Sequence, residues 1–384
     1  MNSIDVLIIG CGLSGAVAAR ELAEHGKKVK ILERRSHIGG NMYDYLDEHG
    51  ILIHQYGPHT FHTKKKHLYE YMCRFTEWNE YKLTCGAEID GRCIPTPFNF
   101  STIDTFYSKE DAVTLKEKIK EEFSDREFAT VTDVLSSDNK KIREYAKFLF
   151  DKDYSLYTAK QWGVSASEID PSVLKRVPLR FSYDEGYFDD AYQVMPKVSY
   201  VEWFNNILNH NNICVELNIE ALDHISLDEN NILFDGEKFN GAVIYTGAVD
   251  ELFNCCYGRL PYRSLRFEWK YEDIESKQKY PVVAYPQAEG YTRITEYKKL
   301  PVQDVKGTTY AVEYPLPYKA GESNEPYYPV LTEESQELYA KYKALADKVD
   351  NLYLCGRLAD FKYYNMDQAL EKALELSEQL IRNN

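Results

Sequence analysis

The sequence predicts an α/β fold, and three observations carry that prediction. An apolar run over 4–9 enters the string Gly10-Cys11-Gly12-Leu13-Ser14-Gly15, and after an Ala-rich amphipathic segment a second apolar run ends on Glu33. Residues 102–170 are charged, poor in glycine and spaced as in helices. Segments at 177–200 and 262–315 are rich in Tyr, Val, Thr and Phe. We therefore predict a Rossmann-like dinucleotide-binding domain, a helical insertion and an antiparallel sheet domain.

The first unit is a strand, a tight turn, a helix and a strand that ends on an acid, as in folds that hold the adenosine half of a dinucleotide. Gly10 permits the turn, Gly12 lets the backbone approach the pyrophosphate, and Gly15 lets the helix pack on the strand. The unpaired N–H groups at the helix N-terminus then favour the pyrophosphate anion. Glu33 is placed to accept hydrogen bonds from the ribose hydroxyls. The cofactor-binding residues predicted here are Gly10, Gly12, Leu13, Ser14, Gly15 and Glu33.

The segment after Glu33 distinguishes between two dinucleotides. It reads Arg34-Arg35-Ser36-His37-Ile38-Gly39-Gly40-Asn41, whereas NAD-binding folds usually continue there into another helix. A basic segment that closes on Gly-Gly is typical of flavoproteins, in which the glycines let the chain pass close to FAD. We therefore predict FAD as the cofactor, with Arg34, Gly40 and Asn41 among its contacts.

Length, charge and cysteine spacing limit the function classes. A chain of 384 residues exceeds the usual size of a single core, so we expect two or three subdomains. The net charge of −15 argues against nucleic acid as a partner, because proteins that bind it carry a basic field. No apolar run reaches the ~20 residues that span a bilayer, and no signal peptide precedes the first strand, so we expect a cytoplasmic protein. The eight cysteines show no C-x-x-C spacing, and we assign no disulfide and no metal site.

A short predicted strand at 51–53 runs into three histidines, His54, His59 and His62. A zinc site would need further ligands, but this segment has no cysteine or carboxylate, and Gly57-Pro58 breaks any helix that would align the rings. We therefore expect one histidine to lie at the flavin, where an imidazole can tune the ring.

The other elements follow from periodicity and turn residues. Asp90-Gly91 is a favourable hairpin turn, and Thr246-Gly247-Ala248 resembles the second chain crossing of FAD enzymes. Near the C-terminus, a strand, Gly356-Arg357 and a long helix repeat the strand–Gly–helix pattern, which commonly brings a helix N-terminus to the flavin. We predict helices over 66–76, 116–123, 140–150, 201–209 and 366–381, and strands within 82–100, 177–200, 242–245, 262–315 and 352–355.

Both ends of the chain are therefore expected to build one discontinuous FAD-binding domain. The predicted boundaries are 1–65, 196–260 and 345–384 for that domain, 101–175 for the helical insertion, and 66–100, 176–195 and 261–344 for the sheet domain that binds substrate.

Tyrosine is unusually abundant, with 32 residues, and several tyrosines stand near arginines. A flat ring suits a nucleobase, guanidinium forks suit phosphates and phenols suit the remaining oxygens, so these groups fit a uridine diphosphate. Each group alone is equally consistent with a core aromatic or a surface ion pair. The stretches concerned are 157–163, Arg176, Tyr187-Phe188, 291–296 and 325–329.

Together these stretches resemble the bacterial UDP-galactopyranose mutase family. The matching motifs fall in order across nearly the whole chain, and Y-T-x-K-Q-W-G and Y-T-R-I-T-E are more specific than the glycine turn. They are Gly10-x-Gly12-x-x-Gly15, His37-Ile38-Gly39-Gly40-Asn41, Gly57-Pro58-His59-x-Phe61-His62-Thr63, Pro97-Phe98-Asn99, Tyr157-Thr158-x-Lys160-Gln161-Trp162-Gly163, Lys175-Arg176-x-Pro178, Tyr291-Thr292-Arg293-Ile294-Thr295-Glu296 and Gly356-Arg357-Leu358. The resemblance implies an FAD domain, a helical bundle and a twisted antiparallel sheet, with the substrate cleft between them.

The resemblance also implies a redox-neutral isomerisation in which reduced FAD is a nucleophile. Its N5 would attack the anomeric carbon and displace UDP, and the covalent sugar adduct would open and reclose through another hydroxyl. UDP would then return, so that UDP-galactopyranose becomes UDP-galactofuranose for cell-surface polysaccharide synthesis. The implied partners are this nucleotide sugar and a flavin reductant such as NAD(P)H or a reductase. The sequence leaves the oligomeric state open, with a homodimer through the helical insertion as one alternative.

The residue roles carried over by motif divide between cofactor and substrate. Arg176 and Arg293 would clamp the diphosphate, and His59 would lie against the flavin; these three are the predicted catalytic residues. Arg357 would lie near the pyrimidine edge of the flavin, together with Gly356 and Met366. The further substrate-binding residues are Tyr157, which would stack on the uracil, Tyr154, Thr158, Trp162, Tyr187, Tyr363, Asn365 and one of Tyr327 and Tyr328, with Tyr327 preferred.

Two departures from the family pattern affect the sugar or the base end. Asp153 and Tyr154 stand where an aromatic pair often precedes the Tyr-Thr motif, and Asn365 stands where an Asp is frequent. An amide can hydrogen-bond a sugar hydroxyl but carries no charge. A dTDP-6-deoxyhexose or UDP-N-acetylgalactosamine therefore stays an alternative substrate. An amine-oxidase-like FAD oxidoreductase and a non-catalytic flavin scaffold stay alternative functions.

Overall fold

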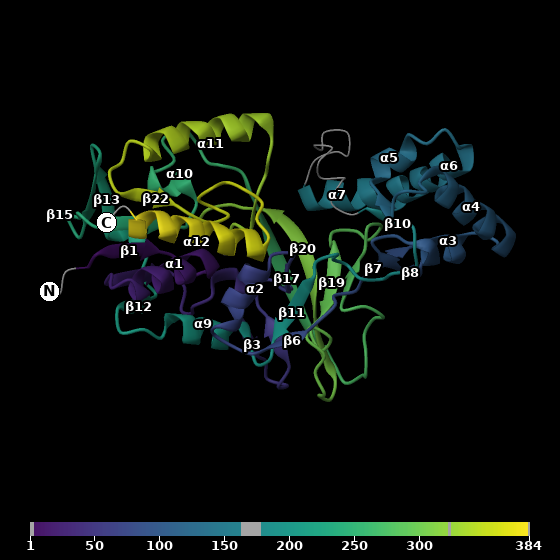
Figure 1. Ribbon diagram of the computed structural model, residues 1–384, viewed down its shortest axis with the longest axis horizontal. Helices are drawn as coiled ribbons and strands as arrows, with labels where there is room; N and C mark the ends of the chain where they lie inside the picture. Colours follow the sequence, from purple (N-terminus) through teal and green to yellow (C-terminus); the bar gives the residue numbers. More distant parts are fainter. Residues whose placement is uncertain (1–3, 163–177, 322–323, 383–384) are drawn as a thin grey trace.

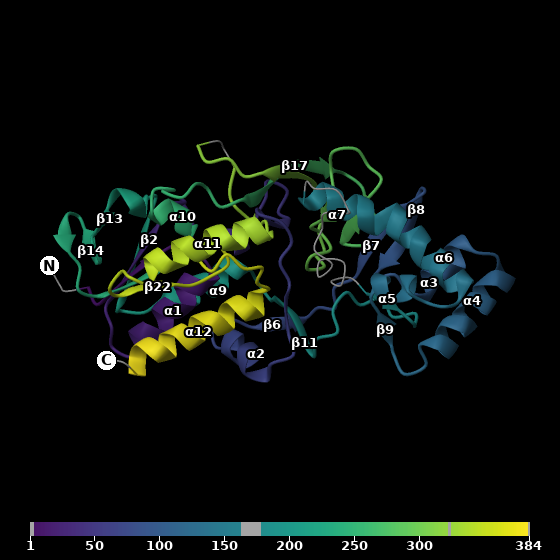
Figure 2. The ribbon, with the colours of Figure 1, turned by 90° about the horizontal axis from the view of Figure 1, so that it is seen from above.

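The computed structural model describes residues 4–162, 178–321 and 324–382, which form three blocks in a row (Figure 1). A parallel sheet with its helices forms one end, a mostly antiparallel sheet stands in the middle, and a group of helices forms the other end. Both ends of the chain lie in the parallel-sheet block, as the view from above also shows (Figure 2). The first and last elements of the chain are therefore neighbours.

Five parallel strands form the first sheet, in the order β12-β2-β1-β16-β22. Val6 and Ile8 of β1 belong to one apolar core, and Leu7 and Ile9 belong to the core on the opposite face. A strand that is buried on both faces needs a continuous apolar run, which explains the lack of polar alternation here. The strands are β1 (Val6–Ile9), β2 (Val29–Glu33), β12 (Ile213–Leu217), β16 (Ala242–Tyr245) and β22 (Leu352–Leu354).

Helices cover both faces of this sheet. One face is covered by α1 (Leu13–Glu24), α2 (Lys66–Cys73), α9 (Tyr200–Leu208) and α12 (Met366–Arg382). The other face carries α10 (Val249–Leu252), α11 (Glu333–Ala346) and the strands β13 (Ile225–Asp228), β14 (Asn231–Phe234) and β15 (Glu237–Lys238).

The middle block is a seven-stranded sheet in the order β21-β17-β20-β19-β18-β7-β8. The predicted antiparallel sheet is present, with one exception: β18 runs parallel to β7, with Val282 beside Cys85. These two strands are far apart in the chain, so no hairpin turn fixes their relative direction. The strands are β7 (Cys85–Ile89), β8 (Arg92–Thr96), β17 (Tyr262–Glu272), β18 (Val282–Ala284), β19 (Arg293–Glu296), β20 (Thr308–Pro317) and β21 (Tyr328–Pro329).

The helical insertion has an apolar core of its own at the far end of the molecule (Figure 1). Two of its helices, α6 and α7, are joined by a π-helical turn, which adds a residue to the helix and so turns the side chains of α7 relative to those of α6. The elements are α3 (Phe100–Phe106), α4 (Lys109–Glu122), β9 (Phe128–Ala129), α5 (Val131–Leu135), α6 (Lys140–Leu149), the π turn η2 (Phe150–Tyr154), α7 (Ser155–Trp162) and β10 (Leu179–Arg180), which pairs with β9.

Short strands complete the fold and bear on the predicted boundaries. A pair, β3 (Asp44–Leu46) and β4 (Leu52–His54), follows the first unit. A separate three-stranded sheet joins β5 (Phe61–Thr63), β6 (Trp78–Glu80) and β11 (Tyr192–Pro196), which come from segments assigned to two different predicted domains. The α/β fold class is confirmed, whereas the domain boundaries stay a prediction. Within the three described ranges, no helix has the length and apolar character needed to cross a membrane.

Candidate active site

The glycine turn after β1 is held by close packing. Gly10 has a φ of +100°, and a Cβ on it would lie 2.2 Å from the Oγ1 of Thr246, at the end of β16. A Cβ on Gly15 would lie 2.1 Å from the carbonyl oxygen of Gly10. Gly12 caps α1 without a side-chain acceptor, so the N–H groups of the first helical turn need an acceptor from outside the helix. This arrangement fits a bound pyrophosphate.

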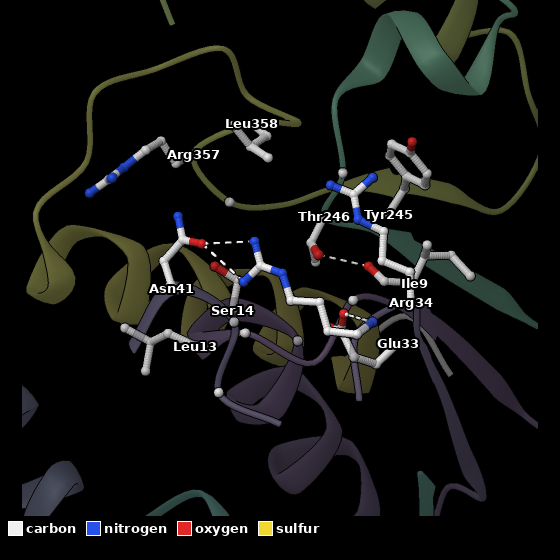
Figure 3. Close-up of a pocket in the computed structure, with 18 of the residues that line it drawn as sticks. Ile9, Leu13, Ser14, Glu33, Arg34, Asn41, Tyr245, Thr246, Arg357 and Leu358 are labelled. Atoms are coloured by element: carbon white, nitrogen blue, oxygen red, sulfur yellow. Dashed lines mark hydrogen bonds between the residues drawn. The ribbon is translucent and has the colours of Figure 1, made fainter. Parts of the chain in front are cut away.

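One cavity extends from this turn in both directions (Figure 3). Figure 3 shows Arg34 and Arg357 on opposite sides of Ser14 and Asn41. Every predicted cofactor-binding residue lines this cavity: Gly10, Gly12, Leu13, Ser14, Gly15, Glu33, Arg34, Gly40, Asn41, His59, Gly356, Arg357 and Met366. The N-terminus of α12 reaches the cavity with Asn365 and Met366. The lining by residues from both ends of the chain and the uncapped α1 fit a dinucleotide.

Glu33 braces the turn as well as lining the cavity. Its side chain is buried, with one carboxylate oxygen accepting the N–H of Cys11 at 2.7 Å and the other accepting the N–H of Arg35 at 2.9 Å. A carboxylate has about four acceptor positions, so lone pairs remain for ribose hydroxyls.

Glu325 is a residue of this site that the sequence analysis did not single out. It accepts from Arg34 at 2.8 Å and from Arg35 at 3.1 Å, while Arg35 also donates to the Oδ1 of Asn41 at 3.0 Å. Burial would raise the pKa of Glu325, but Arg35 and Arg34 outweigh burial and hold it below its usual value. Glu325 therefore ties the cofactor cavity to the segment that carries Tyr327. Its place directly before Pro326 and two tyrosines was the signal available in the sequence.

The three histidines have different surroundings. Burial and the charges of Arg357 and Arg293 lower the pKa of His59 to about 4, and its Nδ1 lies 2.8 Å from the carbonyl oxygen of Gly57. His62 lies 2.7 Å from Asp190, and His54 accepts the N–H of His59 at 3.0 Å. Among the residues that the structure describes, no three His, Cys, Asp or Glu side chains gather as a metal site.

A second group of polar side chains surrounds Arg293 on β19. The Nε and Nη2 of Arg293 donate to one carboxylate oxygen of Glu313 on β20, at 2.8 and 2.7 Å. Burial alone would lower the pKa of Arg293, but Glu313 reverses that effect and keeps the guanidinium charged. Tyr157 lies on α7, which packs against β20, and burial raises its pKa against the opposing charge of Arg293, so it is a neutral phenol. Two predicted substrate residues, Arg293 and Tyr157, thus lie on neighbouring elements. Glu313, an acid inside an apolar strand, was not predicted.

A stack of aromatic rings and one guanidinium connects the two groups. The rings of Tyr328 and Tyr363 lie 5.1 Å apart and nearly parallel, and Arg357 lies over both, at 4.9 and 5.4 Å from their centres. Burial raises the pKa of Tyr328, and the charges of Arg357 and Arg293 oppose that rise. Tyr327, in contrast, is buried and contacts Tyr56 at 6.3 Å between ring centres. The geometry therefore favours Tyr328 over Tyr327 as a substrate contact.

The remaining predicted substrate residues differ in their surroundings. Tyr154 is buried in the core of the helical insertion, with its ring 5.6 Å from that of Phe98, and Thr158 is buried as well. Asn365 is exposed at the rim of the cofactor cavity. Trp162 is the last residue of α7. Arg176 lies outside the described residues.

Comparisons with known proteins identify the family. A family model described as UDP-galactopyranose mutase matches residues 152–363, and one described as NAD(P)-binding Rossmann-like domain matches residues 8–75. A UDP-galactopyranose mutase of Mycoplasma pneumoniae is 36% identical to this chain, over 99% of this chain and 97% of its own. The chain belongs to the UDP-galactopyranose mutase family.

This is a family of flavin-dependent isomerases, so the protein is an enzyme of that class. A second similar protein is a dTDP-fucopyranose mutase of Escherichia coli, 35% identical over 99% of both chains. The crystal structure of a reduced UDP-galactopyranose mutase has a TM-score of 0.73, covers 100% of this chain and 95% of its own, and is 16% identical. At that identity it shows the shared mutase fold alone.

The contact between two glycines in the cavity wall leads to a prediction. Gly40 has a φ of +54°, and a Cβ on it would lie 2.9 Å from the Cα of Gly12, whereas Gly50, with a φ of +74°, has open space around it. Gly40→Ala should lower the flavin content of the purified protein several-fold, because it displaces the turn at α1. Gly50→Ala carries a similar left-handed strain of about 1 kcal/mol but should keep the wild-type flavin content. Flavin absorbance per mole of protein measures both, and equal contents in the two variants would contradict the assignment.

Proposed function

We propose that the protein converts UDP-galactopyranose into UDP-galactofuranose, with FAD bound in the cavity and reduced during turnover. One observation carries this proposal: His59 lines the cofactor cavity together with Arg357 and also lies beside Arg293, which is available to bind an anion. The Nδ1 of His59 is 2.8 Å from the carbonyl oxygen of Gly57, and a Cβ on Gly57 would lie 3.8 Å from the Nη2 of Arg293. The anion-binding group and one end of the cofactor cavity therefore meet at the same imidazole. In a chain of net charge −15, this cationic group favours an anionic substrate beside the cofactor.

The residues of the chain hold the nucleotide while the sugar reacts. When bound, reduced flavin supplies N5 as the nucleophile for the anomeric carbon. Arg293 offers guanidinium N–H groups to the diphosphate, since Glu313 occupies only its Nε and Nη2. Tyr328 and Tyr363 add phenol donors from the stack under Arg357. Holding UDP in place after it leaves the sugar makes its return an effectively intramolecular step.

Tyr157, Tyr187 and His59 complete the proposed site. Tyr157 presents a neutral ring from α7 for the nucleobase, and Tyr187 donates to a phosphate oxygen. His59 is neutral, because its pKa is about 4, and its Nδ1 proton is directed to the carbonyl oxygen of Gly57. The Nε2 of His59 therefore acts as an acceptor at the flavin. Arg176 would provide a second guanidinium for the diphosphate, as the family motif implies.

A related nucleotide sugar is the second candidate substrate. The identity to the dTDP-fucopyranose mutase, 35%, is almost the same as the 36% to the UDP-galactopyranose mutase of Mycoplasma pneumoniae. Asp153, one turn before Tyr157, is half-buried, and burial raises its pKa to about 7, so the base end of the proposed cleft carries a titratable carboxyl.

A reductant such as NAD(P)H or a reductase would supply the electrons that reduce the flavin, and the product would serve polysaccharide synthesis.

The substrate proposal is tested with a panel of nucleotide sugars. Dithionite-reduced protein is incubated separately with UDP-galactofuranose, UDP-N-acetylgalactosamine and dTDP-fucose in the furanose and pyranose forms, and the products are separated by chromatography. We expect UDP-galactose to be interconverted with the highest kcat/KM. Faster conversion of dTDP-fucose would assign the second candidate, and conversion of none would contradict the proposed function.

The clamp role of Arg293 leads to a prediction about binding. Arg293→Ala should weaken UDP binding by about 100-fold, since it removes charge-assisted hydrogen bonds and leaves the buried Glu313 carboxylate unpaired beside the diphosphate. Arg293→Lys keeps the charge but loses the planar fork, and should weaken binding by about tenfold. Arg266→Ala is the matched control, because Arg266 is exposed and stacks on Tyr314 away from this group. Calorimetric titration with UDP measures all three, and wild-type affinity in Arg293→Ala would rule out the clamp.

A further inference from the structure

Lys160 lies in the same short motif as Tyr157, yet it takes no part in the cofactor cavity or in the Arg293 group. We propose that Lys160 is a positioning residue that fixes α7, with Tyr157, relative to the strand that carries Arg293. The proposal rests on the proposed function only for its nucleotide-binding consequence. Its structural consequence, that Lys160 holds one loop in place, does not depend on any substrate.

The ammonium group of Lys160 is fully used by one loop. It donates to the main-chain carbonyl oxygens of Tyr285 at 2.5 Å, Ala288 at 2.8 Å and Tyr291 at 2.9 Å, all between β18 and β19. A lysine ammonium has three N–H donors, so none is left over. Among the described residues, no other group donates to the carbonyl oxygens of Ala288 and Tyr291. The conformation of this loop, residues 285–292, therefore depends on Lys160.

The loop leads directly into the anion-binding strand. Thr292 donates from its N–H at 2.9 Å and from its Oγ1 at 3.2 Å to the carbonyl oxygen of Glu313. The next residue, Arg293, binds the carboxylate of the same Glu313. Lys160 thus holds the carbonyl of Tyr291 two residues before the guanidinium, and a shift of the loop would move Arg293 relative to Glu313.

The other end of the connection is α7. Lys160 follows Tyr157 by three residues, so the two side chains lie on one face of the helix, a turn apart. The carbonyl oxygen of Lys160 accepts from the Nη2 of Arg263 on β17 at 3.3 Å. Residue 160 is therefore joined to the sheet through both its side chain and its main chain. This places the ring of Tyr157 at a fixed distance from Arg293.

The chain offers a matched control for this connection. Lys152, in the π turn η2, donates to Asp90 at 3.0 Å, and Asp90 in turn exchanges hydrogen bonds with Gln287 of the same loop. Lys152 also bridges the helical insertion and the sheet. Its ion pair with Asp90 is exposed and has a single acceptor, and such pairs contribute little to stability. Lys152→Met therefore removes an ammonium between the same two blocks without affecting the three carbonyls.

Hydrogen exchange of the holoprotein, without nucleotide, tests the structural consequence. In the wild type, the N–H of Ala288 donates to the carbonyl of Tyr285, and the N–H of Tyr285 donates to that of Thr292. Lys160→Met should speed exchange in a peptide covering 284–292 by about tenfold or more, because the loop loses three hydrogen bonds. Lys152→Met should leave it unchanged, and equal exchange in all three proteins would overturn the proposal.

Calorimetric titration with UDP tests the consequence for binding. Lys160→Met should weaken UDP binding by about tenfold, by displacing Arg293 and Tyr157. In an Arg293→Lys background the same substitution should weaken it by less than about twofold, because a group that acts through Arg293 gives a non-additive cycle. Unchanged affinity in folded, flavin-loaded Lys160→Met, or an additive cycle, would overturn the positioning role.

Two further measurements separate a failure of the Lys160 proposal from a folding defect and from a failure of the proposed function. Lys160→Gln retains two N–H donors and should fall between wild type and Lys160→Met in both measurements, so it serves where Lys160→Met does not fold. If the wild-type protein does not bind UDP, the proposed function fails, while the exchange experiment still decides on Lys160.

Discussion

The cofactor site depends on one close approach between strands that are far apart in the sequence. The turn after β1 packs so tightly against Thr246, at the end of β16, that Gly10 has no room for a side chain. The Oγ1 of Thr246 donates to the carbonyl of Ile9 at 2.7 Å and fixes the ends of the two strands. This contact directs the uncapped start of α1 into the cavity at the carboxyl ends of the parallel strands, where open α/β sheets bind their ligands.

The acidic chain keeps the arginines of the proposed site in place with a few buried or half-buried carboxylates. Glu313 holds Arg293, and Glu325 holds Arg34 and Arg35. Burying a charge without a partner costs free energy of folding, and these carboxylates offset that cost for the guanidinium groups before a ligand is present. They also set the direction of the N–H groups that remain free. The arginines can therefore bind anions although the chain as a whole repels them.

Local patterns predicted most of the fold and many, though not all, of the residues that line the cofactor cavity; Glu220 and Glu251, for example, were not predicted. The glycine turn, the Gly39-Gly40 segment and the C-terminal strand–Gly–helix each have their own sequence signals, and the structure brings all of them to one cavity. The partners Glu313 and Glu325 were not predicted, because each is defined by a contact across strands or loops that no local spacing encodes. Tyr327 and Tyr328 are neighbours in the sequence, and only the three-dimensional structure shows that Tyr328 stacks on Tyr363 whereas Tyr327 lines the cofactor cavity. The parallel pairing of β18 with β7 is likewise set by tertiary packing.

In the proposed reaction, the bound flavin takes part in an isomerisation without net oxidation of the sugar. Comparing the amount of product with the amount of reduced flavin tests this reaction. A known amount of protein is reduced once with dithionite in the absence of oxygen, UDP-galactofuranose is added in large excess, and the product is measured together with the flavin spectrum. We expect many equivalents of UDP-galactopyranose per flavin, with the flavin still reduced at the end and no conversion by the oxidised protein. One equivalent of product per flavin with reoxidation of the flavin, or equal conversion by the oxidised protein, would contradict it.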